Sequence, residues 1–245
     1  MNDRIKIKIL KISLSIIVVI LVLFIAMIYL VTYHEEGEGN LPFKISKIVI
    51  VSGVDGVQKE NQGTQWALDV NQNNDIYLYI NKNKSYGKTE LIESVKINNF
   101  TITKQTETGE TKIYKTSSEE NKMFSNTSEF ETNELIYKGE TESNIKQEKI
   151  SNQGGIVAFR CANNKVSQYL ANNISELNYN QLLKLTGVKQ EDLNVSVSFD
   201  IEIKVVNKKT YQATVELDLP VEGVIEQGTT NLEITNLENI VFKII

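Results

Sequence analysis

The stretch VSVSFDIEIKV, residues Val195–Val205, alternates apolar and polar side chains without a break. Alternation of this length is typical of a β-strand that buries one face and exposes the other. A second alternating run, Tyr211–Leu219, follows after the polar connection Asn207–Lys209. A three-residue loop between the runs keeps the apolar residues of both on one face. In this register the predicted cross-strand pairs are Val205–Tyr211, Ile203–Ala213, Ile201–Val215 and Phe199–Leu217.

An earlier segment shows the same alternation on both sides of a polar stretch. Residues 66–70 alternate before Asn71–Asp75, and residues 76–80 alternate after it. We interpret Asn71–Asp75 as a five-residue hairpin loop, because Asn and Asp are common in turns. In the next segment the apolar phase shifts at Asn98–Asn99, and one extra residue there, a β-bulge, restores the common face.

The rest of the chain after residue 41 reads as further strands with one helix. The other predicted strands are Ile45–Val51, Thr111–Thr116, Glu134–Lys138, Ile156–Cys161, Val166–Leu170 and Ile240–Ile244. The helix is predicted to begin after Asn178, which can cap it, and to end at Gly187. The predicted fold class is therefore mainly β, a β-sandwich-like domain with one short helix. Polar stretches within residues 117–155 leave open a boundary between two subdomains.

The N-terminal part has a different pattern. Ile12–Val31 is an apolar run of twenty residues, and a helix of that length is about 30 Å long, enough to cross a bilayer. Basic residues predominate before the run, so the positive-inside rule places the N-terminus in the cytoplasm. No small-residue cleavage pair follows it, which favours an uncleaved anchor. The predicted organisation is a cytoplasmic basic tail 1–11, a transmembrane helix 12–33, a spacer 34–41 and an extracytoplasmic β-rich domain 42–245.

The charge and cysteine content restrict the class of partner. Residues 1–11 contribute +3 to the net charge of −5, so the rest of the chain carries −8. An acidic ectodomain argues against nucleic acid and against adhesion to an anionic surface by charge alone. A single cysteine excludes an intramolecular disulfide. Many Gram-positive surface proteins likewise have no disulfides, whereas eukaryotic secreted domains of this size usually have them. The expected partners are the lipid bilayer, through the N-terminal helix, and an envelope protein or glycan.

One cysteine, one histidine and a nearby arginine are the residue types that sortases, the thiol transpeptidases of Gram-positive surfaces, use. Arg160 and Cys161 are neighbours on a predicted strand, so their side chains point to opposite faces. His34 lies beside the predicted membrane helix, and the sequence at Ala158–Cys161 lacks the Thr-Leu-x-Thr-Cys signature of sortases. We therefore interpret Cys161 as a buried structural thiol and predict no catalytic residue.

Two groups of oxygen-bearing side chains are candidate cation sites. Asp69–Asp75 resembles the start of a calcium loop, but Asn74 and Ile80 stand where such a loop needs Gly and a bidentate Glu. In the predicted late hairpin Asp200 lies opposite Glu216, a like-charge pair that a cation would relieve. A hairpin loop and a solvated strand face explain the two groups without an ion. No metal site and no cofactor is therefore predicted, although the sequence leaves both places open.

The expected function is non-catalytic. We expect a single-pass, membrane-anchored envelope protein whose β-rich ectodomain binds or scaffolds other components at the bacterial cell surface. The alternative is an accessory or sensory ectodomain that modulates a partner membrane protein by contact. A cryptic envelope hydrolase or transpeptidase is a third class, which needs a cleft with convergent polar groups. In organisation alone the chain resembles the broad group of single-pass membrane proteins of Gram-positive bacteria.

Overall fold

The computed structural model describes residues 17–27, 41–62, 65–117, 122–129, 134–141, 148–173 and 175–245. Residues 17–27 form a helix with exposed side chains. Among the described residues no helix has both the length and the apolar content needed to cross a membrane. The predicted transmembrane segment 12–33 falls only partly within the described residues. The predicted tail 1–11 and His34 lie outside them.

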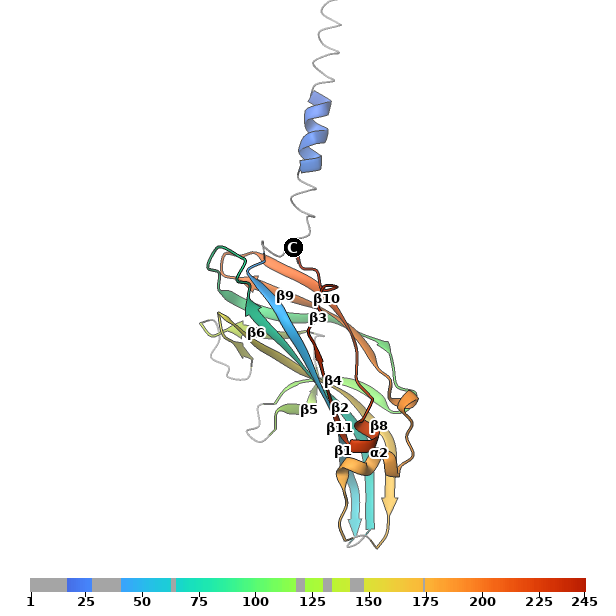
Figure 1. Ribbon diagram of the computed structural model, residues 1–245. Coiled ribbons are helices and arrows are strands. Elements are labelled where there is room, and N and C mark those ends of the chain that lie inside the picture. Colours follow the sequence, from blue (N-terminus) through green and yellow to red (C-terminus); the bar gives the residue numbers. More distant parts are fainter. Residues whose placement is uncertain are drawn as a thin grey trace, which may run out of the picture.

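Two six-stranded sheets make up most of the described chain (Figure 1). The first has the order β11 (Thr229–Ile234), β1 (Phe43–Gln62), β2 (Gln65–Lys82), β8 (Gly154–Ala171), β4 (Glu110–Thr116) and β5 (Phe124–Glu129). The second has the order β12 (Lys243–Ile244), β10 (Thr210–Asp218), β9 (Ser196–Val205), β3 (Ile92–Lys104), β6 (Leu135–Gly139) and β7 (Lys149–Ile150). The mainly β, sandwich-like architecture predicted from the sequence is confirmed.

A large hydrophobic core lies between the two sheets. Three aromatic rings hold its centre, with Phe159 from β8 in one sheet and Phe100 and Phe199 from β3 and β9 in the other. The Phe159 and Phe199 rings meet edge to face at 5.2 Å, and the Phe100 and Phe199 rings stack at 5.8 Å. Aromatic pairs in these geometries add to the stability that burial alone supplies. The rings therefore join the two sheets.

The β9–β10 hairpin has the predicted faces but not the predicted register. Phe199 pairs with Val215, so the predicted Phe199–Leu217 pair is wrong. The loop still has three residues, because the Val205 N–H donates to the Lys209 carbonyl at 2.9 Å. Lys208 has a φ of 73°, and this left-handed residue closes the loop earlier than expected. A shift by two residues leaves every side chain on its predicted face, and the alternating burial of β9 agrees with that prediction.

The predicted hairpin at Asn71–Asp75 is wrong, because residues 65–82 form the single strand β2. The apolar residues on both sides of Asn71–Asp75 carry even numbers, so a continuous strand keeps them on one face. Gln72 and Asn74 occupy that face between them, and both are buried. β2 pairs with β1 along its whole length. The two strands predicted at Ile156–Cys161 and Val166–Leu170 likewise belong to one strand, β8.

The β-bulge predicted at Asn98–Asn99 is confirmed. β3 gains one residue relative to β9 between Asn98 and Thr101, and Asn99 adopts a left-handed φ of 50°. The bulge moves Phe100 onto the core side, where it meets the two other phenylalanine rings.

Beyond the sandwich, β1, β2 and β8 continue as a three-stranded extension, made of residues 54–62, 65–70 and 166–171 (Figure 1). Short helices pack with it: η2 (Tyr179–Gln181), α2 (Leu182–Leu185), η3 (Gln190–Leu193) and α3 (Val224–Gln227). The extension has a second small core that includes Leu68, Val70, Leu182 and Leu183. The predicted helix is confirmed, with Asn178 as its cap and Gly187 at a φ of 72°. α3 is a second short helix that the sequence did not reveal.

Candidate functional site

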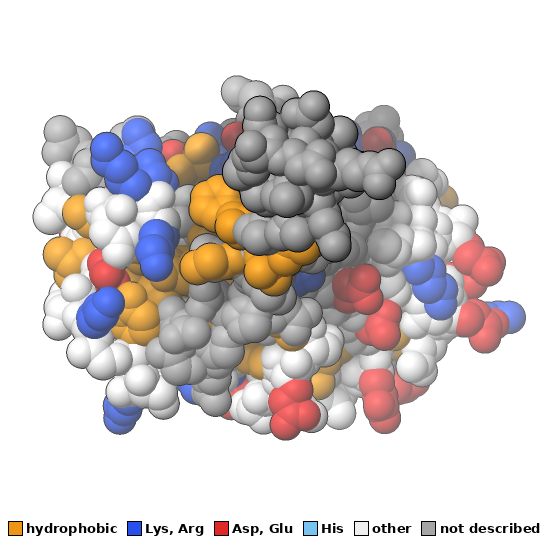
Figure 2. Space-filling model, turned by 90° about the horizontal axis from the view of Figure 1, so that it is seen from above, with side chains coloured by type: hydrophobic (Ala, Val, Ile, Leu, Met, Phe, Trp, Pro, Cys, Tyr) orange, Lys and Arg blue, Asp and Glu red, His pale blue; other side chains and the backbone are white. Residues whose placement is uncertain are grey.

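The strands place two surfaces at opposite ends of the domain. β1 begins at Phe43 and runs for 20 residues into the extension, a length of about 65 Å at about 3.3 Å per residue. At the end where β1 begins, four segments meet: residues 41–44, 81–91, 206–210 and 238–245. Backbone hydrogen bonds join Asn83 to Pro42 (2.9 Å), Val206 to Leu91 (3.0 Å) and Ile245 to Thr210 (3.0 Å). We call this surface the basal end (Figure 2).

Cys161 lies inside the large core, where the sequence placed it. Its side chain is completely buried, and burial raises the pKa of the thiol to about 12. The thiol is therefore protonated at neutral pH, and the nucleophilic thiolate does not form. Arg160 points to the other face of β8, as neighbouring strand positions require. The structure therefore does not bring the cysteine and the arginine to one site.

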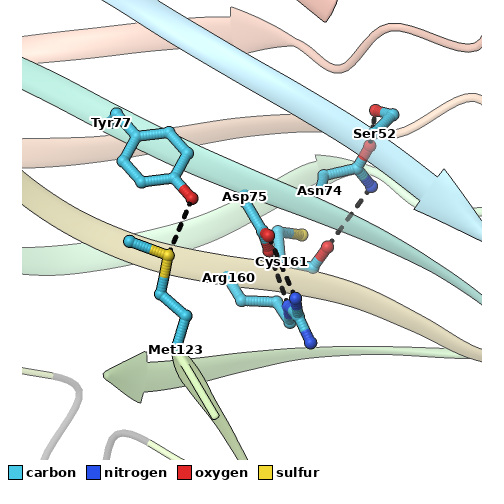
Figure 3. Close-up of polar contacts among 7 residues, drawn as sticks. All are labelled: Ser52, Asn74, Asp75, Tyr77, Met123, Arg160 and Cys161. Carbon is cyan, nitrogen blue, oxygen red and sulfur yellow. Dashed lines mark hydrogen bonds and ion pairs between the residues drawn. The ribbon is translucent and has the colours of Figure 1, made fainter. Parts of the chain in front are cut away.

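Arg160 instead forms a two-pronged ion pair with Asp75 on the face opposite the core (Figure 3). Its Nε and Nη2 lie 2.6 and 3.0 Å from the two carboxylate oxygens. The guanidinium also lies 5.0 Å from the ring centre of Phe124, which comes from β5. Beside it, the Tyr77 hydroxyl donates to the sulfur of Met123 at 3.2 Å. This group holds β5 against β2 and β8, and the arginine's charge is already matched by a carboxylate.

A belt of buried polar side chains separates the large core from the small one. Its members lie on the inner face of the first sheet: Ser52, Gln72, Asn74, Thr111 and Asn163. Ser52 donates to the Asn74 side chain, and Asn74 Nδ2 donates to the Cys161 carbonyl at 3.3 Å (Figure 3). Asn163 Nδ2 donates to Gln72 Oε1 at 2.8 Å, and Thr111 donates to Asn163 at 2.9 Å. Because these bonds join neighbouring strands, the belt serves the sheet and does not form an open site.

The calcium-like segment does not form an ion site. Asp69 and Asp75 lie on the same face of β2 but six positions apart, which is about 20 Å along a strand. Asp69 pairs with Lys59 at 2.8 Å, while Asp75 pairs with Arg160. Within the described part of the chain, no group of three or more His, Cys, Asp or Glu residues is placed to hold a metal ion.

The observed hairpin register also separates Asp200 from Glu216. Asp200 pairs with Thr214, so the predicted like-charge pair is wrong. Its carboxylate accepts hydrogen bonds from Asn99 (2.8 Å), Gln212 (2.9 Å) and Thr214 (2.6 Å). Partial burial by itself raises the pKa of Asp200, but these three bonds outweigh it and lower the pKa below its ordinary value. Asp200 therefore ties the β3 bulge to the hairpin.

The extension exposes large apolar side chains. Leu170 is 74% exposed and Val57 is 49% exposed, and both lie on the sheet face opposite the helices. On the helical side Leu185 of α2 is 53% exposed. Tyr179 contacts β1 at Gly56, where a Cβ would come within 3.1 Å of its ring. These exposed apolar side chains on both sides of the extension make it a candidate contact surface.

A groove at the basal end has a volume of about 560 Å³. It lies between the start of β1 and the segment that precedes β12, and its walls include Leu41, Ile45, Leu237 and Phe242. Lys44 and Glu238 are the charged residues that line it. Among the described residues the groove offers one carboxylate, whereas glycoside hydrolysis uses a pair of carboxylates.

No protein-family model, curated protein or solved structure matches the chain.

The two candidate surfaces were not apparent from the sequence, because each combines segments far apart in the chain. One signal was present: Leu185 lies off the apolar face that Tyr179, Leu182, Leu183 and Thr186 form on the predicted helix. Its exposure therefore agrees with the helical period.

Proposed function

We propose that the chain is a single-pass, membrane-anchored protein of the bacterial cell envelope whose domain 42–245 lies outside the cytoplasm. In this proposal it binds or scaffolds another envelope component, a protein or a glycan, through the extension. The observation that carries the proposal is the course of β1, β2 and β8. These strands lead from the basal end, next to the predicted anchor, to exposed apolar side chains; Val57 lies fourteen residues beyond Phe43, which is about 46 Å along the strand.

The predicted anchor supplies the orientation. The eight residues 34–41 separate the apolar segment from the start of the domain, and they span at most about 28 Å even when fully extended. The basal end therefore stays near the bilayer, and the extension points away from it. Three hydrogen-bonded strands with a packed core of their own make this extension a stiff support for the exposed side chains of Val57, Leu170 and Leu185.

A non-catalytic role is supported by the chemistry of the described residues. The thiol of Cys161 is buried and protonated at neutral pH. The guanidinium of Arg160 is engaged by Asp75. Among the described residues, the groove at the basal end carries one lysine and one glutamate, so it does not offer the two carboxylates of a glycoside hydrolase.

The orientation is tested by labelling wall-stripped cells with a membrane-impermeant maleimide. The chain for this test carries Cys161→Ala and Leu185→Cys, which leaves one exposed thiol on the extension. We expect labelling in intact cells. Labelling that requires lysis would overturn the proposed orientation.

The contact surface is tested by photo-crosslinking in intact cells. A photoreactive residue replaces Leu170 or Leu185 on the extension, and matched controls replace Val51 and Ile156, which are exposed on strands of the sandwich. We expect a discrete adduct from the extension positions and none from the controls. Equal adducts from all four positions, or adducts from the controls alone, would overturn the proposal.

The second candidate is an accessory or sensory ectodomain that modulates a partner membrane protein. The groove at the basal end favours this alternative, because it is a hollow of about 560 Å³ that lies next to the predicted anchor. In that case a photoreactive residue at Val241, on the groove wall, gives the adduct, and the extension positions give none.

A further inference from the structure

The fold gathers basic side chains at the basal end of an acidic domain. The four segments of that end contain seven lysines and two glutamates, whereas the rest of residues 41–245 contains fifteen basic and 25 acidic residues. The lysines are Lys44, Lys82, Lys84, Lys88, Lys208, Lys209 and Lys243. Seen from this end, several basic side chains lie beside hydrophobic ones on the left, and most of the visible acidic side chains lie on the right and below (Figure 2).

Six of these lysines have exposed side chains; the partly buried one is Lys44. Within the described part of the chain, none of the six takes part in a recorded ion pair. Between them, Val206 is 50% exposed, Val241 is 40% exposed and Ile245 is 63% exposed. Of the two glutamates, Glu90 accepts a hydrogen bond from Asn207 at 2.7 Å. This arrangement suits the surface of a bilayer, where lysines contact anionic headgroups and apolar side chains reach the boundary of the hydrocarbon layer.

We infer that the basal end docks on the anionic headgroup surface of the bilayer that holds the predicted anchor. This inference rests on the proposed function, because the anchor brings the basal end close to the surface. Charge interactions decay within about 8 Å at physiological ionic strength, so only the side chains nearest the bilayer take part. Acidic side chains elsewhere on the domain are repelled by the same surface only if the domain tilts and brings them within this distance. The separation of charge therefore holds the domain upright, with the extension pointing away from the membrane.

The spacer offers a competing partner for the lysines. It contains Glu35, Glu36 and Glu38, which adjoin the basal end in sequence. The four segments carry a net charge of +5, from seven lysines and two glutamates, so the three spacer carboxylates leave an excess of +2 for the headgroups. The experiment therefore includes a variant in which the carboxylates of the spacer are removed.

The test uses the full chain in vesicles that contain a quencher-labelled lipid. A fluorophore is attached to Val206→Cys at the basal end, in a chain that carries Cys161→Ala, and a matched probe is attached to Leu185→Cys on the extension. With phosphatidylglycerol in the vesicles we expect quenching at position 206 that is lost in pure phosphatidylcholine or at high salt. We expect no quenching at position 185. Equal quenching at both positions, or none at position 206, overturns the docking.

Charge variants identify the groups responsible. Lys208→Glu with Lys209→Glu is expected to abolish the quenching at position 206. The matched control is Lys104→Glu with Lys189→Glu, which makes the same change in net charge at exposed sites away from the basal end. If both double variants lose quenching equally, net charge and not the basal end is responsible, and the inference is wrong.

The spacer arm replaces Glu35, Glu36 and Glu38 by Gln. Docking on the bilayer predicts that quenching at position 206 is retained or increased in this variant. If quenching depends on phosphatidylglycerol in this variant but not in the native chain, the spacer is the native partner of the lysines and the inference is overturned.

Flotation after alkaline extraction distinguishes failure of the proposed anchor from failure of the proposed docking. A chain that fails to float refutes the anchor, whereas a chain that floats with position 206 unquenched refutes the docking alone.

Discussion

The side-chain amide of Asn99 donates a 2.8 Å hydrogen bond to the carboxylate of Asp200 and so joins the β3 bulge to the centre of β9. Gln212 and Thr214 of β10 donate to the same carboxylate. Three strands of the second sheet are therefore connected on their outer face by one side chain. The bulge that brings Phe100 into the core is held from outside by a polar contact.

Removing this carboxylate should destabilise the domain. We expect Asp200→Ala to cost about 1–2 kcal/mol of unfolding free energy, because three donors on partly exposed strands lose a charged acceptor. Glu216→Gln is the matched control on the same hairpin and should change stability by less than about 0.5 kcal/mol. Urea unfolding measures both variants, and a larger loss in the control would contradict this role of Asp200.

The stability contributed by Asp200 should depend on pH with a definite sign. The folded state lowers the pKa of this carboxyl, so the unfolded chain binds the proton more readily. The stabilisation is present above the ordinary aspartate pKa of about 3.9, and it is lost as the pH falls through the lower folded-state value. The difference in stability between the native chain and Asp200→Asn should therefore shrink on acidification. A difference that grows at low pH would refute this.

The register of the late hairpin can be read from engineered disulfides. Ser198 lies opposite Glu216 in β10, whereas the register derived from the sequence places Asp200 there. In a Cys161→Ala chain, the pair Ser198→Cys and Glu216→Cys should form a disulfide on mild oxidation. The pair Asp200→Cys and Glu216→Cys should not, because its Cα atoms are too far apart. Electrophoresis without reductant distinguishes the pairs, and preferential crosslinking of the second one would restore the other register.

The buried cysteine should react only when the protein unfolds. Burial raises the pKa of Cys161 to about 12, and its side chain is completely enclosed. A thiol reagent should therefore modify the native chain only when the core opens, and much more slowly than it modifies an exposed thiol at the same pH. Addition of denaturant should make the reaction fast. Rapid modification of the native chain that increases with pH would show an accessible thiol.

Gly228 should resist substitution more than Gly53. Gly228 has a φ of 74°, and a Cβ there would lie 2.4 Å from the Asn180 carbonyl oxygen, so Gly228→Ala should cost about 2–4 kcal/mol. Gly53 has open space around its Cβ position, so Gly53→Ala should cost less than about 1 kcal/mol. Urea unfolding compares the two variants. Equal costs would mean that Asn180 and α3 do not pack as described.

The sequence predicted features that depend on local periodicity. Alternation in Val195–Val205 identified the buried face of β9, and the phase shift at Asn98–Asn99 identified the bulge. The hairpin register was wrong by two residues, because both registers keep the same faces. The backbone of Lys208 decides between them, and a lysine is not a residue that signals a left-handed conformation.

The apparent loop at Asn71–Asp75 failed for a different reason. Its polar residues resemble a turn when considered alone, but their partners come from other strands. Asn74 accepts from Ser52, Gln72 accepts from Asn163, and Asp75 pairs with Arg160. Cross-strand bonds of this kind pair the Asn74 side chain and the Gln72 Oε1 within a continuous strand, and no pattern inside one segment can reveal them.

By itself the sequence determined which side chains share a strand face, and with that the separation of Arg160 from Cys161. Only the tertiary structure decided which segments lie together. It joined parts of β1, β2 and β8 into the extension and brought lysines from four separate segments to the basal end. The reason is physical: strand faces follow from a repeat of two residues along the backbone. Surface charge and exposed apolar area are sums over side chains that are close in space, whatever their distance along the chain.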